Sequence, residues 1–207
     1  TTAVGLAAGA VQLGVASNAG TRYVNDLTVI SSASTVLLAG TTTLTGNISL
    51  NENGADPGDF VITGNGDVAI AATLIVDTEI GENGGPGAVN WNSSNVYATA
   101  ASVALTINVN RSSGTGGQVN LGVVDNNAGS NLFLTGLTVN TQATSSGELQ
   151  LAGNVLVDGP ISLSRRIVAM NSLTIDSKQS PTGAGNTITI GGAMYACGGV
   201  DRDFTLV

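Results

Sequence analysis

Histidine is absent from this 207-residue chain, and cysteine and lysine each occur once, as Cys197 and Lys178. Without histidine, neither a Ser-His-Asp triad nor a Cys/His metal cluster is available. A single cysteine also excludes a disulfide within the chain. The sequence therefore predicts no catalytic triad, no zinc site and no disulfide framework.

Basic charge is scarce, because 6 Lys and Arg residues face 14 Asp and Glu residues and leave a net charge of −8. Nucleic acids and anionic membrane surfaces are both bound through basic faces. No apolar run approaches the length of a transmembrane helix, which is about 20 residues. We expect no nucleic-acid partner and no membrane insertion by this segment.

The compartment is suggested by composition alone. The chain begins at Thr1 inside a repeated pattern, so the lack of a signal peptide says nothing about export. The near-absence of cysteine and lysine is compatible with a bacterial surface protein that crosses an envelope before it folds. We expect an extracellular or bacterial cell-surface location.

Small and β-branched residues fill the composition instead. Aromatic residues make up only 3% and charged residues 10%, whereas there are 29 glycines and 42% hydrophobic residues. Such residues suit short strands and sharp turns. Because no apolar period of 3.6 residues is sustained, the sequence predicts an all-β fold with a real core.

One short pattern, Leu105–Val109, returns along the chain with apolar residues at its first and third positions. Its returns begin at Leu27, Leu74, Leu137, Leu173 and Phe204. After each return and a turn-rich loop comes a second alternating strand, as at Val89, Val119 and Leu149. Stacked coils of about 31 residues, a right-handed parallel β-helix or β-solenoid, are predicted, with the repeated leucines in one inward column.

A longer repeat lies above the coil. Matched segments lie about half the chain length apart: Val11 with Val119, Leu44 with Leu151, Leu74 with Leu173, and Tyr97 with Tyr195. We expect a single β-solenoid over 1–207 that holds two divergent copies, about 11–118 and 119–207, the second continuing into 1–10 of a next unit. If Val207 were joined to Thr1, Val11 would follow Phe204 at the same distance along the chain as Val119 follows Leu105. That agreement predicts a repeat unit or fragment of a longer array.

Several short motifs carry a resemblance that covers nearly the whole chain. They are Asn25–Val29, Gly46–Leu50, Gly66–Ile70, Leu74–Thr78, Gly116–Gly122 and Gly153–Val157. In these motifs the chain resembles bacterial β-strand-repeat surface proteins, the filamentous-haemagglutinin-like and autotransporter-passenger-like adhesins. The resemblance implies a right-handed parallel β-helix that is exported to the cell surface and serves adhesion or surface structure.

Enzymatic chemistry is weighed first, because many parallel β-helices cleave acidic polysaccharides. That reaction needs clustered carboxylates and a basic side chain. Here the acids are scattered, and the one basic pair, Arg165-Arg166, is interpreted as a solvated surface pair. We predict no catalytic residue and no cofactor, so the protein is expected not to be an enzyme.

Calcium is the metal that the composition leaves open. Gly64–Ile70 resembles one degenerate calcium-binding nonapeptide, which we interpret as a tight turn because that motif works only in tandem. An oxygen-rich set could hold a hard cation if its members lie together: Asp56, Asp59, Asp77, Glu79 and Glu82. No metal ligand is assigned.

Threonine follows the first apolar residue in five of the six repeated strands. These residues are Thr28, Thr106, Thr138, Thr174 and Thr205. In stacked coils they would form an outward ladder at a spacing of about 4.8 Å, which makes ice binding one alternative function. The next outward position is interpreted as closing the strand through bonds to its own backbone, at Asp77, Asn108, Asn140 and Asp176.

Trp91, Cys197 and two matched tyrosines are expected to have structural roles. Trp91 replaces an inward leucine and is expected in the core, and Cys197 is expected to be a small half-buried residue without a basic neighbour. Tyr97 and Tyr195 match and are expected to pack in the core or in a ladder. A platform for sugar rings is the alternative for the two tyrosines, with surface glycans as the partner.

The function predicted from the sequence is a non-enzymatic structural or adhesive module of a bacterial cell surface. Its partners would be neighbouring repeats or copies of itself, stacked end to end in a fibre or filament. The alternatives are a carbohydrate-binding or polysaccharide-cleaving β-helix, with a groove lined by Tyr97, Tyr195 and the acidic loop, and ice binding through the threonine ladder.

Overall fold

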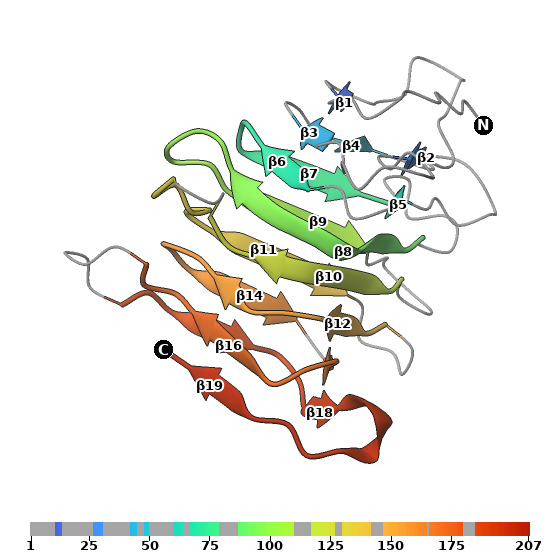
Figure 1. The fold of residues 1–207 in the computed structure, drawn as a ribbon, viewed down its shortest axis with the longest axis vertical. Coiled ribbons are helices and arrows are strands. Elements are labelled where there is room, and N and C mark those ends of the chain that lie inside the picture. Colours follow the sequence, from blue (N-terminus) through green and yellow to red (C-terminus); the bar gives the residue numbers. More distant parts are fainter. Residues whose placement is uncertain are drawn as a thin grey trace.

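The chain folds as an all-β solenoid of stacked parallel strands (Figure 1). The computed structural model describes residues 11–13, 27–30, 42–44, 48–49, 60–63, 67–78, 87–109, 117–126, 130–141, 147–164, 166–179 and 185–207. Within these ranges the strands stack along the long axis of the figure, from β1 at one end to β19 at the other. The predicted fold class is confirmed.

Strand pairing divides each coil into three faces, which the chain visits in a fixed order. Face 1 contains β2 (Leu27–Ile30), β5 (Phe60–Thr63), the first parts of β8 (Val89–Ala98) and β10 (Val119–Val124), β12 (Leu149–Leu151), β15 (Ile167–Ala169) and β18 (Met194–Ala196).

Face 2 follows face 1 in each coil. It contains β1 (Val11–Leu13), β3 (Thr42–Leu44), β6 (Val68–Ile70), the second parts of β8 and β10, β13 (Val155–Leu156), β16 (Leu173–Asp176) and β19 (Phe204–Leu206).

Face 3 is a separate six-stranded sheet. It contains β4 (Ile48–Ser49), β7 (Leu74–Asp77), β9 (Leu105–Val109), β11 (Leu137–Thr141), β14 (Ile161–Ser164) and β17 (Ile188–Ile190). A single 3₁₀ turn in the described part of the chain, η1 (Cys197–Gly199), joins β18 to the segment before β19.

Strands β8 and β10 each bend around the corner between faces 1 and 2. Their register shifts at that corner, where Gly122 of β10 lies over Asn92–Ser94 of β8. A Cβ atom at Gly122 would overlap the backbone oxygen of Ser94, so this close approach requires glycine. The two faces therefore form one continuous sheet here.

Coil length varies more than the sequence suggests. On face 3 the strand register pairs Leu74 with Leu105, Leu105 with Leu137, Leu137 with Ile161, and Ile161 with Ile188, so the later coils are shorter than the earlier ones. The shortest coil joins Leu149 to Ile167 on face 1. The average coil has about 28 residues, fewer than predicted.

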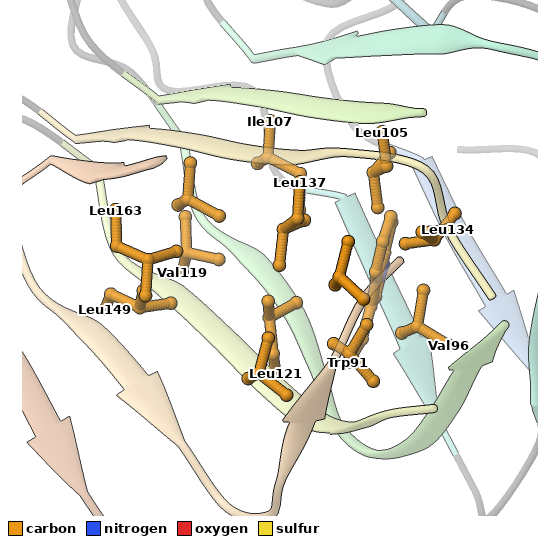
Figure 2. Close-up of a cluster of buried hydrophobic side chains, with 14 of the residues drawn as sticks. Trp91, Val96, Leu105, Ile107, Val119, Leu121, Leu134, Leu137, Leu149 and Leu163 are labelled. Atoms are coloured by element: carbon orange, nitrogen blue, oxygen red, sulfur yellow. The ribbon is translucent and has the colours of Figure 1, made fainter. Parts of the chain in front are cut away.

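Alternation explains the core. On β9 the burial pattern has Leu105, Ile107 and Val109 buried and Thr106 and Asn108 half-buried. The same inward residues from all three faces meet along the axis of the solenoid (Figure 2). Trp91 lies among them with no exposed surface, as predicted. Burying each such side chain stabilises the fold by about 1.5–3 kcal/mol.

The prediction of one inward column through all six repeated strands is wrong in part. Leu74, Leu105 and Leu137 are paired neighbours on face 3, as predicted. Leu27 instead lies on face 1, whereas Leu173 and Phe204 pair with each other on face 2. The error arises because all three faces use the same alternating pattern, so that pattern does not identify a face.

The longer repeat is rotated about the axis. Leu44 and its match Leu151 lie on faces 2 and 1, and Leu74 and its match Leu173 lie on faces 3 and 2. With β8 and β10 counted once on each face they form, each pair is eleven strands apart in chain order. Twelve strands would complete four coils, so matched segments are displaced by one face.

The equal separations used to predict a continuing array do not compare like positions, for the same reason. Val11 and Phe204 both lie on face 2, on β1 and β19. The reference spacing, from Leu105 to Val119, runs from face 3 to face 1. The separation from Phe204 to Val11 would therefore span a full coil on one face, whereas the separation from Leu105 to Val119 spans one corner between two faces.

Candidate functional site

The outward side of face 3 carries two columns of polar side chains that are aligned by the strand register. Strand register aligns Thr106, Thr138, Ser162 and Thr189 in one column, which we call the hydroxyl column. On β7 the same register position is occupied by Ile75, an exposed apolar residue beside Thr106. At the next outward position of each strand, Asp77, Asn108, Asn140 and Ser164 form a second column, the amide column.

Hydrogen bonds join the amide column from coil to coil. Asn140 Nδ2 donates to Asn108 Oδ1 at 2.7 Å, and Asn108 Nδ2 donates to Asp77 Oδ2 at 3.5 Å. The prediction that these side chains close their own strands is therefore wrong for Asn108 and Asn140. It is confirmed for Asp176 on face 2, whose Oδ1 accepts a hydrogen bond from the Lys178 backbone at 2.8 Å.

Ser164, the last residue of the amide column, is hydrogen-bonded to the neighbouring strand β11. Its hydroxyl donates to the Val139 carbonyl at 2.9 Å and accepts from the Thr141 amide at 3.0 Å. The Thr141 hydroxyl in turn donates to the Ser164 carbonyl at 2.9 Å. The end of β11 is thus held against β14 by side-chain bonds as well as by the backbone ladder.

The threonine ladder predicted from the sequence is divided among the faces. Thr106 and Thr138 are neighbours on face 3, whereas Thr174 and Thr205 pair on face 2 and Thr28 lies on face 1. Ser162 and Thr189 complete the hydroxyl column and were missed. Their strands, Ile161–Ser164 and Ile188–Ile190, carry the same alternation but begin with isoleucine rather than with the leucine or phenylalanine of the repeated pattern.

The two matched tyrosines do not form a platform. Tyr97 lies on face 2 and is 5% exposed, whereas Tyr195 lies on face 1 and is 47% exposed. Core packing is confirmed for Tyr97, which is buried, whereas ladder packing of the pair is wrong because residues on different faces do not stack. The carbohydrate alternative needs a groove lined by both tyrosines and the acidic loop. The tyrosines lie on different faces, and the acidic loop at 51–59 lies outside the described residues.

Arg166 is an exposed residue with two partners on face 1. Its guanidinium lies 3.1 Å from Glu148 Oε1 and 4.5 Å from the centre of the Tyr195 ring. Such a surface ion pair contributes about 0–1 kcal/mol. The interpretation as a surface residue is confirmed for Arg166, and Arg165 is not among the residues described.

The candidate cation ligands are not brought together within the described chain. Asp56, Asp59, Glu79 and Glu82 lie outside it, so Asp77 is the one member whose surroundings are known. No group of three or more metal-ligating acids, cysteines or histidines occurs among the described residues. The turn predicted at Gly64–Ile70 is not tested, because 64–66 lie outside the described residues and Val68–Ile70 form β6. Asp67 Oδ1 accepts a hydrogen bond from the Asn95 amide at 3.3 Å, which ties it to the next coil.

Cys197 lies half-buried at the start of η1, as predicted, and is a free thiol. Gly198 and Gly199 follow it with φ angles of 77° and 66°, a conformation that favours glycine. Of the described segments, none is a helix with the length and apolarity to span a membrane.

Comparisons of this chain with protein-family models, with curated proteins and with solved structures gave no match.

Proposed function

We propose that this chain is a non-enzymatic structural module of a bacterial cell-surface protein, a stiff β-solenoid that stacks end to end. The partner at its end is another coil of the same kind, supplied by a neighbouring repeat or by another copy. Adhesion and fibre or filament formation are the roles that such a module serves at an extracellular location.

The observation that carries the proposal is the exposure of inward side chains in the last coil. Leu206 continues the inward column of Ile175, yet Leu206 is 54% exposed and Ile175 has no exposed surface. Phe204, Ile188 and Met194 continue inward columns on the three faces and are only partly buried. Covering these side chains with another coil would bury apolar surface at about 25 cal/mol per Å².

Strand edges at the same end support this proposal. Each of β17, β18 and β19 pairs with one preceding strand in the described structure. Their other edges present backbone donors and acceptors in the geometry that a further parallel strand would use. Another coil would satisfy the three edges and the apolar columns together.

The surface location rests on sequence features rather than on the site. The net charge of −8, the single cysteine and the resemblance to bacterial β-strand-repeat surface proteins all support an exported protein. The non-enzymatic role is supported by the scattering of the acidic side chains. Release of reducing ends from acidic polysaccharides by the purified chain would contradict this role.

End-to-end stacking is tested by sedimentation velocity over a range of concentrations. We expect the 207-residue chain to self-associate, and Leu206→Asp to abolish association because it places a charge in the contact. The control is Thr205→Asp, an exposed neighbour on the same strand whose side chain points away from the core. A wild-type chain that stays monomeric, or equal effects of both substitutions, would contradict stacking.

A further inference from the structure

We propose that face 3 is an ice-binding surface formed by the hydroxyl and amide columns. This role goes beyond the structural function and uses a different part of the molecule. The proposed ligand is the oxygen lattice of ice, recognised through a layer of water ordered on the protein.

The first support is a two-dimensional net of polar groups. Thr106, Thr138, Ser162 and Thr189 are direct neighbours in the strand register, so their hydroxyls repeat about every 4.8 Å along the axis. Along each strand the amide column lies at the next outward position, about 6.7 Å away. Both repeats are close to the spacings between oxygen atoms on the prism faces of ice.

The second support is the state of the hydroxyl groups. The side chains of Thr106, Thr138, Ser162 and Thr189 make no hydrogen bond to another described residue. Elsewhere on the solenoid comparable hydroxyls are used internally, as Thr135 donates to Val103 O at 3.1 Å and Thr78 to Gly87 O at 3.1 Å. The donors and acceptors of the hydroxyl column are therefore left for water.

Rigidity of the neighbouring column is the third support. The bonds from Asn140 to Asn108 and from Asn108 to Asp77 fix the amide orientations from coil to coil. Water bound between the two columns would meet groups that are already ordered, so little side-chain entropy is lost on binding.

The shape and the low charge of face 3 also suit contact with an ice surface. On the other side of the hydroxyl column lie Ala104 and Gly136, where a Cβ atom at Gly136 would meet Ala104 Cβ at 3.4 Å. No bulky side chain rises from these two positions. Ile75, which is 42% exposed, is the one large apolar side chain among the described outward positions of the two columns, and it lies beside Thr106. Asp77 is the one charged residue among the described outward positions of the two columns, so few ionic groups disturb the bound water.

Face 1 provides the contrast within the same molecule. Its outward positions include the ion pair of Arg166 with Glu148 and the exposed ring of Tyr195. These long side chains stand above the sheet and interrupt its regularity. Face 3 is therefore the surface to which we assign the ice lattice.

The test compares thermal hysteresis, the gap between the melting and freezing temperatures of ice, in three forms of the chain. We expect hysteresis for the wild type and loss of most of it for Thr138→Tyr, whose ring would rise above the hydroxyl column. The matched control is Thr174→Tyr, which changes a half-buried outward threonine on face 2. That variant is expected to keep the wild-type hysteresis.

Circular dichroism melts establish that each variant is folded. If Thr138→Tyr does not fold, the double variant Thr106→Val and Thr138→Val keeps the side-chain shapes and removes two hydroxyls. Loss of hysteresis in the valine variant supports the proposal. It is overturned if the folded wild type shows no hysteresis at its highest soluble concentration, or if the face 2 variant loses as much as the face 3 variant. Binding to insoluble chitin or cellulose without hysteresis would also overturn it.

Discussion

At the scale of single residues, inward and outward positions follow directly from the local sequence. Leu105, Ile107 and Trp91 were predicted to face the core, and each has 1% or less of its surface exposed. Alternation predicts this well because successive side chains of a strand point to opposite faces, whichever strand lies beside it. Partners in neighbouring strands are not needed for the prediction.

Close backbone contacts are a residue-scale feature that the sequence does not reveal. Gly159 and Gly136 are both buried glycines near corners of neighbouring coils. A Cβ atom at Gly159 would overlap the carbonyl oxygen of Thr135, whereas one at Gly136 would make an ordinary contact with Ala104. The backbone bond from Asp158 N to Leu134 O, at 2.8 Å, fixes the close approach at Gly159.

We expect Gly159→Ala to lower the free energy of unfolding by about 1–3 kcal/mol, because the added methyl group forces backbone atoms apart. Chemical denaturation monitored by circular dichroism measures this change. The control, Gly136→Ala, should change stability by less than about 0.5 kcal/mol. Equal costs at the two positions would show that the strands beside Gly159 are not packed as described.

At the scale of elements, the pairing of strands decides what an outward residue does. Asn108 and Asp176 occupy the same place in two copies of one sequence pattern, and both were expected to bond their own backbone. Asp176 does so through Lys178 N, but Asn108 has Asp77 and Asn140 beside it in the neighbouring coils. A local pattern cannot predict this difference, because it depends on which residue the next coil places alongside.

A double-mutant cycle measures the amide column. Asn108→Ala, Asn140→Ala and the double variant should give a coupling energy of about 0.5–1.5 kcal/mol, as for one side-chain hydrogen bond. The measurement is again the free energy of unfolding. Thr106→Ala with Thr138→Ala is the matched cycle, since these neighbours share a register but no hydrogen bond. Its coupling energy should be near zero. Equal coupling energies in both cycles would contradict a stabilising hydrogen bond between Asn140 and Asn108.

At the scale of the whole molecule, the fold class was predictable but the assignment of strands to faces was not. Stacked coils follow from a recurring pattern that cannot bury its own apolar side. The face on which a strand lies depends on the lengths of all the corners before it, and these lengths differ widely between the coil from Leu27 to Phe60 and the coil from Leu149 to Ile167. The repeated pattern therefore predicts one coil from Leu137 to Leu173, whereas this segment makes more than one full circuit of the three faces.

The displacement of the long repeat has a consequence for a longer array. Because matched segments are eleven strands apart in a three-sided coil, each further copy would present its equivalent surface one face further around the axis. Features that lie on face 3 in one copy would thus recur on all three sides over three copies. In contrast, the exposed apolar side chains of the last coil lie at the end of the solenoid axis, so a rotation about that axis does not change their position at the end.

All of these proposals depend on which residues are neighbours between coils, and disulfide trapping tests that register directly. With Cys197 replaced by Ser, Thr138→Cys and Ser162→Cys place two thiols on paired positions of face 3, about 4.8 Å apart between Cα atoms. The comparison pair is Thr138→Cys with Thr174→Cys, which a single threonine column would make neighbours. We predict rapid oxidation to an intramolecular disulfide for 138 with 162 and none for 138 with 174, by mass spectrometry of non-reduced peptides. A disulfide between 138 and 174 in the folded chain, with none between 138 and 162, would contradict the three-face register.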